Sequence, residues 1–283
     1  MNITLLCPDD ASRVPSLARK VPLVLTPFLG QTVIEHALAR LAGTGAKNVR
    51  IVAPDRPDEI SRVVGRGEAW GITVEVLPVA DRIDFEASMT AAAASPAASS
   101  GSKLPACFVL DHLPQAPQLP LWQSYRGWYA AQQTLLPTLA RERVGMREVK
   151  PGVFVGLRSQ VAPDASLAGP CWIGANVRIG PRAVIGAGAI IEDGAYVDEG
   201  VEVAGSILGP QTYLGSFTEL RDSFAWGTDL LNLDSGSLIE VTDRFLLSEV
   251  QSERGFFGRL VDAVRGTRKD SPGPGRGAGQ EGV

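Results

Sequence analysis

Cysteine, histidine and long apolar stretches are all scarce in this chain of 283 residues. The three cysteines (Cys7, Cys107 and Cys171) are isolated and show no C-x-x-C spacing, which argues against a disulfide framework or a thiolate metal site. No run approaches the ~18 uninterrupted apolar residues that a membrane span needs, so we expect no transmembrane segment. The N-terminus has no basic segment and carries Asp9 and Asp10, unlike a signal peptide, so we expect a cytoplasmic protein.

An excess of positive charge is also absent. Lys and Arg total 27 against 31 Asp and Glu, for a net charge of −4. This balance argues against a dedicated nucleic-acid binder, because such proteins carry a basic face. Apolar residues make up 45% of the chain, which is enough for a core and excludes wholesale disorder.

Glycine and proline, by contrast, are concentrated between residues 151 and 216 and again after residue 272. In the first stretch every sixth residue is aliphatic, and after one five-residue step the period resumes. Four positions after nearly every one of these aliphatic residues stands a compact side chain. The residue directly after the aliphatic one is commonly Gly, Ala, Glu or Asp. The aliphatic positions are Val161, Leu167, Ile173, Ile179, Ile185, Ile191, Val197, Val203, Leu208, Leu214 and Leu220.

This spacing has a physical interpretation. Six residues make one short extended face and a turn, three faces close a triangular coil, and the aliphatic side chains stack inside it. The pattern resembles the hexapeptide repeat of left-handed parallel β-helices, and it predicts such a domain with a cap over residues 151–250. The cap is expected to include residues 224–227 and 243–247. A coincidental alternation in an ordinary sheet is the alternative.

Histidine content bears on what the repeat does. The resemblance implies that acyl transfer is one option, since many acyltransferases of this kind use a histidine base in a groove between subunits. The two histidines, His36 and His112, both lie outside the coils, and His36 is expected to be structural. We therefore interpret the repeat as a scaffold and association surface, with a hexapeptide-repeat acyltransferase as the weaker alternative.

Residues 1–111 alternate between strand and helix patterns, which predicts an α/β fold with a parallel sheet and right-handed crossovers. The expected strands are residues 2–7, 49–53, 72–77 and 107–110, and the expected helices are residues 32–41 and 57–64.

Residues 25–36 (LTPFLGQTVIEH) are followed by Leu41, Gly45, residues 49–52 (VRIV) and residues 70–74 (WGITV). This run resembles the sugar-phosphate nucleotidyltransferase family, the NDP-sugar pyrophosphorylases. In several members a nucleotide-binding α/β domain precedes a C-terminal left-handed β-helix. The resemblance therefore implies a shortened, Rossmann-like nucleotidyltransferase domain over residues 1–120 and a linker helix within residues 121–150.

The resemblance also implies site residues. Arg13 would contact phosphates, and Lys20 would do so if the chain is shifted by three residues. Thr90 and Ala91 echo the segment that meets the base of the nucleotide, and Asp111 would hold Mg²⁺ if the protein is active. The residues alone favour other roles: Arg13 as a surface-loop residue rather than a phosphate contact, and Asp111 as a strand-end residue that caps a turn rather than a metal ligand.

Two departures from the family limit the expected activity. The loop at residues 7–13 contains no glycine, and Pro8 has no amide to donate to a phosphate. Only about forty residues separate Asp111 from the repeat, so the half that would bind the sugar phosphate is missing. Because phosphoryl transfer relies on positioning and charge stabilisation, we expect a protein that is weak or inactive alone.

The C-terminal residues differ from the rest. Residues 251–266 contain an amphipathic pattern, and from Arg254 onward six basic residues oppose three acidic ones. This segment is expected to be a helix that packs on its own protein, docks on a partner or binds a membrane surface. Residues 267–283 are expected to be disordered, and residues 86–103, rich in Ala, Ser and Pro, to include a loop.

Three functions remain open from the sequence. The first is a diverged nucleotidyltransferase-like protein of sugar-nucleotide or surface-polysaccharide metabolism, which would bind a nucleotide or a sugar phosphate. The second is a non-catalytic assembly or regulatory subunit that associates through the repeat, with itself or with a full-length relative. The third is acyl transfer.

Overall fold

The N-terminal part of the chain forms a four-stranded parallel sheet in the order β5–β4–β1–β6. In β1 (Asn2–Leu6) apolar residues are buried on both faces, as is typical of a central parallel strand. The register places Leu5 opposite Ile51 of β4 and opposite Phe108 of β6. The flanking strands are β4 (Asn48–Ala53), β5 (Thr73–Pro78) and β6 (Cys107–Val109). The four predicted strands are confirmed, each to within about a residue at either end.

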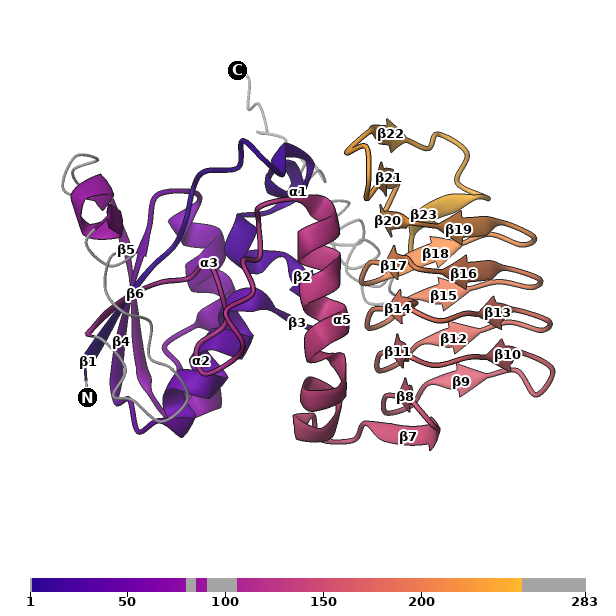
Figure 1. The fold of residues 1–283 in the computed structure, drawn as a ribbon, viewed down its shortest axis with the longest axis horizontal. Coiled ribbons are helices and arrows are strands. Elements are labelled where there is room, and N and C mark those ends of the chain that lie inside the picture. Colours follow the sequence, from indigo (N-terminus) through magenta and orange to yellow (C-terminus); the bar gives the residue numbers. More distant parts are fainter. Residues whose placement is uncertain (1, 80–84, 91–105, 251–283) are drawn as a thin grey trace, which may run out of the picture. The chain divides into compact units, whose positions relative to one another are not determined.

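This computed structural model describes residues 2–79, 85–90 and 106–250, and residues up to Glu249 belong to one compact unit. It shows a mixed α/β protein with several parallel sheets (Figure 1). Among the described residues, no helix is both long and apolar enough to cross a membrane. The expectations for residues 251–266 and 267–283, and for most of residues 86–103, lie outside the described part.

Helix α2 (Val33–Gly43) follows a tight hairpin made by β2 (Pro27–Phe28) and β3 (Gln31–Thr32). Thr32 caps the helix: its Oγ1 accepts from the Glu35 amide, while the Glu35 carboxylate accepts from the Thr32 amide. The face that carries Ile34, Leu38 and Leu41 is buried in the core. The helix predicted from the spacing is confirmed, together with α3 (Pro57–Val64).

Helix α5 (Tyr125–Glu142) lies within residues 121–150, where a linker helix was expected. Ser124 caps it by accepting a hydrogen bond from the Gly127 amide. Its buried residues, Trp128 and Leu136 among them, belong to one hydrophobic core with the N-terminal sheet and with Trp172 and Ile190 of the strand-rich region. Figure 1 shows α5 between these two parts of the unit. The helix is thus a shared wall of the core rather than an isolated linker.

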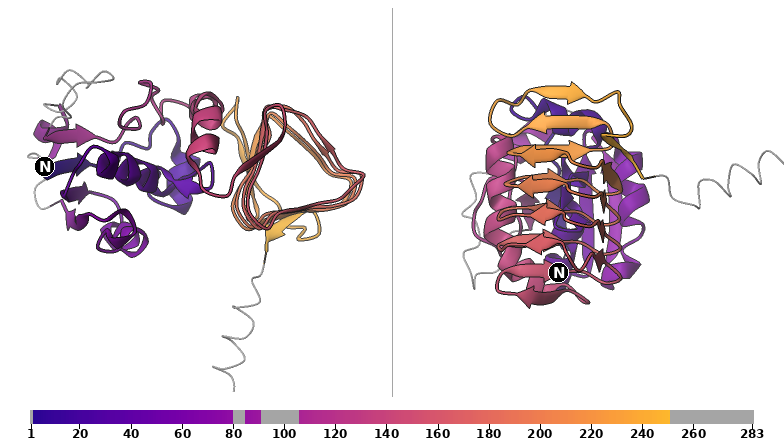
Figure 2. Two further views of the ribbon diagram at one scale, coloured as in Figure 1. Left: turned by 90° about the horizontal axis from the view of Figure 1, so that it is seen from below. Right: turned by 90° about the vertical axis from the view of Figure 1, so that its right-hand side faces the viewer.

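The C-terminal region is rich in short strands, and every third strand along the chain pairs in parallel. The sheet that faces α5, here named the covered sheet, has at its centre β8 (Val153–Val155), β11 (Cys171–Ile173), β14 (Ile190–Ile191), β17 (Ile207–Leu208) and β20 (Ser223–Trp226). A second sheet contains β9 (Gln160–Val161), β12 (Arg178–Ile179), β15 (Tyr196–Val197) and β18 (Thr212–Leu214). A third contains β10 (Ser166–Leu167), β13 (Val184–Ile185), β16 (Glu202–Ala204) and β19 (Glu219–Arg221). Figure 2 shows the successive coils superposed in a triangular outline.

The aliphatic residues of the six-residue repeat stack on one another inside these coils. Leu167 pairs with Ile185, which pairs with Val203, and Val203 pairs with Leu220. From Ile173 onward every position of the column is buried, whereas Val161 and Leu167 in the first coil are half-buried. The predicted burial of the repeat is therefore confirmed, and the five-residue step shortens the later coils by one residue without breaking the column.

The last coil is covered by antiparallel strands. β21 (Asp229–Asn232) pairs with β20, β22 (Leu238–Glu240) pairs with β21, and β23 (Leu247–Glu249) pairs with β18. At the opposite end β7 (Arg147–Lys150) pairs antiparallel with β8. These reversals in strand direction end the parallel stacking at both ends of the covered sheet.

Candidate functional site

Two of the predicted site residues, Thr90 and Asp111, lie near the carboxyl ends of β1 and β6. The two strands are paired at Leu6 and Val109, and β6 runs on to Asp111, whereas the loop that leaves β1 carries Arg13 to the start of the helix that begins at Pro15. Thr90 belongs to a short helix over residues 85–90, whose Phe85 packs against the same two strands. This edge is the place where a parallel α/β sheet commonly binds ligands.

The side chains of these predicted residues are exposed or already bonded. Arg13 is exposed, and Thr90 donates from its hydroxyl to the Glu86 carbonyl at 2.9 Å. One carboxylate oxygen of Asp111 lies 2.5 Å from Nδ1 of His112, whose ring packs edge-on against Phe108. Ala91 lies outside the described residues.

Asp111 does not belong to a ready-made cluster of metal ligands. Over residues 2–79, 85–90 and 106–250, no three His, Cys, Asp or Glu side chains are grouped so that they could hold a metal ion by themselves. In the loop before Arg13, Asp10 accepts a hydrogen bond from the Ser12 amide at 3.0 Å. Hydrogen bonds from Ser12, with a smaller effect of the Arg13 charge, lower the pKa of Asp10. Burial raises the pKa of Cys7 to about 12, so its thiol stays protonated.

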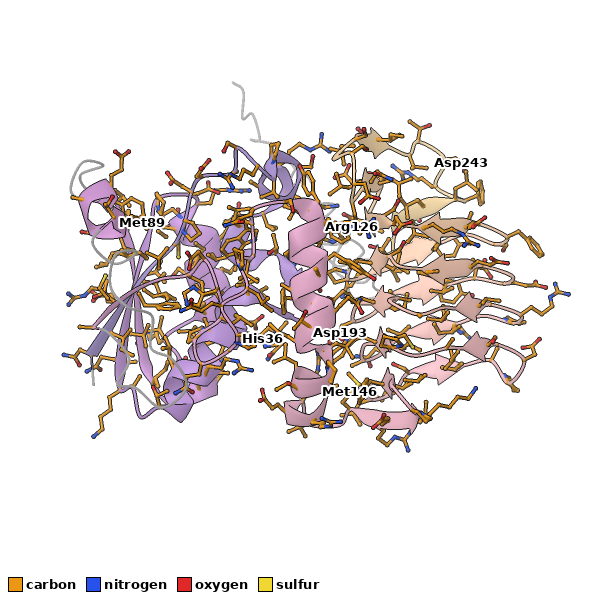
Figure 3. All side chains as sticks on the ribbon, viewed as in Figure 1. His36, Met89, Arg126, Met146, Asp193 and Asp243 are labelled. Atoms are coloured by element: carbon orange, nitrogen blue, oxygen red, sulfur yellow. The ribbon has the colours of Figure 1, made fainter. Side chains whose placement is uncertain are left out.

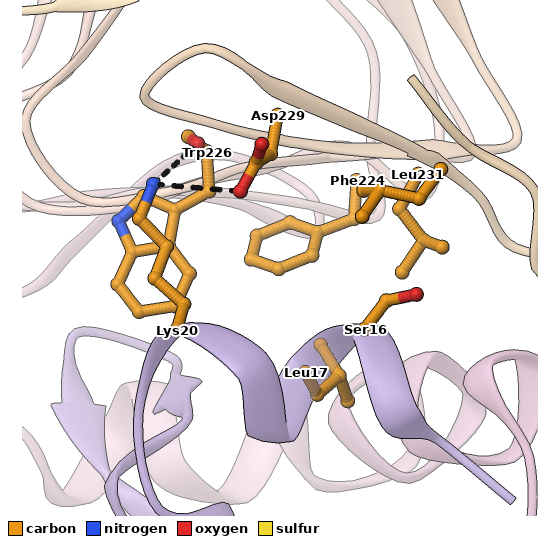
Figure 4. Close-up of a pocket in the computed structure, with 8 residues that line it drawn as sticks. Ser16, Leu17, Lys20, Phe224, Trp226, Asp229 and Leu231 are labelled. Atoms are coloured by element: carbon orange, nitrogen blue, oxygen red, sulfur yellow. Dashed lines mark hydrogen bonds and ion pairs between the residues drawn. The ribbon is translucent and has the colours of Figure 1, made fainter. Parts of the chain in front are cut away.

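Lys20, the other predicted phosphate ligand, is committed elsewhere. It is the last residue of α1 (Pro15–Lys20), and its ammonium donates to the Trp226 carbonyl at 2.7 Å. The same group lies 4.8 Å from the centre of the Trp226 ring and 4.0 Å from Asp229 (Figure 4). Its neighbour Arg19 pairs with Asp229 at 2.9 Å. The structure therefore joins Lys20 to the last coil.

The hollow beside Lys20 is too small for a nucleotide. It lies between Leu17 of α1 and the side chains of Phe224, Trp226 and Leu231, and Figure 4 shows these groups facing one another. Its volume is about 10 Å³, which is room for a single water at most. The contact between α1 and the last coil is therefore a packed joint.

A larger hollow of about 470 Å³ lies between α2 and the end of α5. Its walls include His36, Arg40, Trp70 and Arg143. Both arginines already have acidic partners: Arg40 binds Glu142 at 3.2 Å, and Arg143 binds an aspartate of the coils. The charges of these walls thus largely cancel.

Next to this hollow lies a partly buried polar group of five residues, here named the junction cluster: Gly30, His36, Arg143, Glu192 and Asp193. The Gly30 amide donates to Glu192 Oε2 at 2.5 Å. Arg143 donates to the Leu29 carbonyl at 2.9 Å and to Asp193 at 2.5 Å, so it links the hairpin turn to the coils. Figure 3 labels His36 and Asp193, which come from the two parts of the unit that this cluster connects.

Burial shifts both titratable groups of the cluster that could change charge near neutrality. Glu192 is 1% exposed, and burial, reinforced by the charge of Asp193, raises its pKa to about 8. Burial lowers the pKa of His36 to about 4, and Nε2 of His36 lies 2.7 Å from the Phe28 carbonyl. A neutral histidine must donate through this nitrogen, so His36 is a structural donor, as expected from the sequence.

The position of Glu192 in the coils explains why sequence reasoning missed it. The strand register aligns Glu192 with Gly156, Gly174 and Gly209 in neighbouring coils and with Trp226 in the last one. A β-carbon at Gly174 would collide with the carboxylate of Asp193, so this corner is crowded. The two residues of this column that are not glycine both contact the N-terminal part: Glu192 contacts Gly30, and Trp226 contacts Lys20. The break in the glycine column was the available signal.

Comparison with known proteins identifies no family: no family model matches the sequence, and no curated protein matches it.

Proposed function

We propose that this protein is a diverged nucleotidyltransferase-like protein that acts as a non-catalytic assembly or regulatory subunit in sugar-nucleotide or surface-polysaccharide metabolism. In this proposal residues 1–120 form a shortened Rossmann-like domain and residues 151–250 a left-handed parallel β-helix. The two are held in one unit by α5.

The strand arrangement supports both assignments. A parallel sheet with β1 between β4 and β6 matches the way doubly wound nucleotide-binding sheets begin. In a triangular β-helix each of three parallel sheets receives every third strand along the chain, and the C-terminal strands follow this order. Its corners recur with a positive φ at nearly every sixth residue, including Asn176, Arg182, Gly188, Gly194 and Gly200.

One observation carries the non-catalytic part of the proposal: the ammonium of Lys20 is bound by the last coil. A lysine that donates to the Trp226 carbonyl at 2.7 Å and lies over the Trp226 ring is not free to contact a triphosphate. Moving it would break a charged hydrogen bond and a cation–π contact. Arg13 is then the one predicted phosphate ligand that remains available, which is too little to position a phosphoryl group.

The second and third sheets offer the surface for association. Their outer faces are not covered by α5. Val184 on the third sheet is 40% exposed, and Phe217, in the turn between β18 and β19, is 72% exposed. Exposed apolar residues beside charged ones, as with Phe217 and Arg182, are a common composition of interfaces. The partner in this proposal is a second copy of the chain or a full-length relative.

The test is a turnover assay on the purified full chain, with each nucleoside triphosphate, Mg²⁺ and a panel of sugar 1-phosphates, together with its native mass. We expect no pyrophosphate release above the protein-free control, and a mass above that of the monomer or a stable complex with an active relative. Pyrophosphate release at an enzymatic rate would eliminate the non-catalytic assignment.

Residual nucleotide binding is a second candidate, favoured by the position of Thr90 and Asp111 near one sheet edge and by the exposed Arg13 in the loop that leaves this edge. It is tested by calorimetric titration with nucleoside triphosphates with and without Mg²⁺, and an Arg13→Ala variant serves as the control. Binding that weakens in the variant supports it, whereas an absence of heat at millimolar ligand eliminates it. Acyl transfer gains no support, since neither His36 nor His112 belongs to the coils.

A further inference from the structure

Glu192 is an acid in a position that the neighbouring coils give to glycine. Its side chain is 1% exposed, and Oε1 has no hydrogen-bond partner among the described residues. Oε2 accepts from the Gly30 amide at 2.5 Å, and the Gly30 and Leu29 amides favour the charged form of the carboxyl. Burial outweighs them, because ionising a carboxyl that is out of contact with water and has one oxygen without a partner is costly, so the environment favours the neutral form.

The charged groups around Glu192 come from each element that packs against it. Asp193, its neighbour in the coil, repels a negative charge. Arg143, just after α5, attracts one, but its guanidinium already binds Asp193 and the Leu29 carbonyl. From α2 comes His36, which is neutral above about pH 5 because burial lowers its pKa to about 4. The hairpin contributes only amides, and the adjoining coils contribute Gly174 and Gly209 at this corner.

We propose that Glu192 is a protonation-dependent latch: its neutral carboxyl holds the turn at Leu29 and Gly30 against the coil, and loss of the proton favours release of that turn. The proposal concerns the joint between the two parts of the unit and is independent of any nucleotide chemistry. The turn leads directly into α2, and Arg143 binds both the turn and the coil, so release would loosen the contact between them.

The direction of the effect follows from the two states of the carboxyl. In the closed joint burial raises the pKa of Glu192 to about 8, whereas in an opened, hydrated joint the carboxyl returns to its ordinary value near 4.5. Between these values the closed state retains a proton that the open state releases. Opening therefore becomes easier as the pH rises toward 8, and it changes little with pH above that value.

A carboxyl is required for such behaviour, which distinguishes this latch from a simple structural contact. In a Glu192→Gln variant the new side chain would keep an oxygen for the Gly30 amide, but it would have no proton to lose. The variant therefore preserves the shape of the joint and removes only the titration.

The experiment is hydrogen–deuterium exchange of the full chain between pH 5.5 and 9, corrected for the intrinsic pH dependence of exchange and followed in a peptide that contains Leu29 and Gly30. We expect protection of this peptide to fall by up to about tenfold per pH unit up to about pH 8 and then to level off. In Glu192→Gln the protection should not change with pH, and a peptide around Ile185 should be independent of pH in both proteins.

A flat profile in the wild-type protein, or equal slopes in the wild type and Glu192→Gln, would overturn the proposal. If Glu192→Gln does not fold, Asp193→Asn replaces it. Removing the Asp193 charge takes away a repulsion and frees Arg143, and both changes favour the ionised carboxyl. The levelling-off should then occur at a lower pH, and an unchanged profile would contradict the latch.

Discussion

At the scale of single residues, the joint depends on one glycine. Leu29 and Gly30 both have positive φ, at 51° and 79°, as the two-residue turn of a hairpin requires. A β-carbon at Gly30 would overlap the guanidinium of Arg143. The absence of a side chain therefore allows Arg143 to reach the Leu29 carbonyl across the turn.

Gly30→Ala should lower the free energy of unfolding by about 2–4 kcal/mol, because it strains the turn and displaces a charged hydrogen bond. Gly43→Ala is the matched control: Gly43 ends α2, and nothing lies within 4 Å of the added carbon. That variant should be neutral or gain up to about 1 kcal/mol. Urea unfolding of both variants measures the difference, and equal stabilities would contradict this account of the turn.

The free energy of unfolding should also depend on pH through Glu192. The raised pKa means that the folded chain retains a proton up to about pH 8 that the unfolded chain releases near 4.5. This stabilisation is fully present at low pH and is lost as the pH rises, by up to about 1.4 kcal/mol per unit. Urea unfolding from pH 5.5 to 7.5 should show a steeper decline in the wild type than in Glu192→Gln. Parallel profiles would show that Glu192 is ionised when folded.

At the scale of elements, the covered sheet is buried on both faces. Its inward residues continue the six-residue repeat, while its outward residues pack into the core that α5 shares. These outward residues are Phe154, Trp172, Ile190, Ile207 and Phe224. Trp128 of α5 meets Phe224 with ring centres 5.1 Å apart.

Two outward-facing residues test whether the outer face of the covered sheet is more buried than that of the third sheet. Ile190 on the covered sheet is fully buried, whereas Val184 on the third sheet is 40% exposed. Ile190→Ala should cost about 2–4 kcal/mol of unfolding free energy, and Val184→Ala less than about 0.5. Chemical denaturation of both variants is the measurement. A similar loss for the two would mean that α5 does not cover this face.

The inward column could be predicted because it depends only on local spacing, as Ile173 and Ile185 show. The helix over residues 33–43 was equally accessible, since its cap and its buried face are both local. The outward column of Trp172, Ile190 and Ile207 was also present in the sequence. Its period is three repeat units, so it becomes visible only once the coils are known to be triangular.

The candidate site was less predictable for a different reason. Asp111 could be placed at the carboxyl edge of the sheet because it directly follows a strand of a parallel sheet. The partners of Lys20 and Glu192 are long-range: Lys20 meets Trp226, and Glu192 meets Gly30. No local pattern around either residue reveals such contacts, and the family resemblance assigned Lys20 a different role.

At the scale of the whole described unit, the N-terminal sheet and the coils share a single hydrophobic core. The charged contacts of Lys20 and Arg143 reinforce it at two levels of the coils. Lys20 and Arg143 therefore serve as structural contacts between the N-terminal part and the coils, whereas Arg13 is exposed.

The most direct test compares the stability of Lys20→Met with that of Arg13→Met by equilibrium urea unfolding of the full chain. If Lys20 is a structural contact of the last coil, its variant should lose about 1–2 kcal/mol, while Arg13→Met stays within about 0.5 kcal/mol of the wild type. If both variants unfold like the wild type, Lys20 does not join α1 to the coils, and the central claim fails.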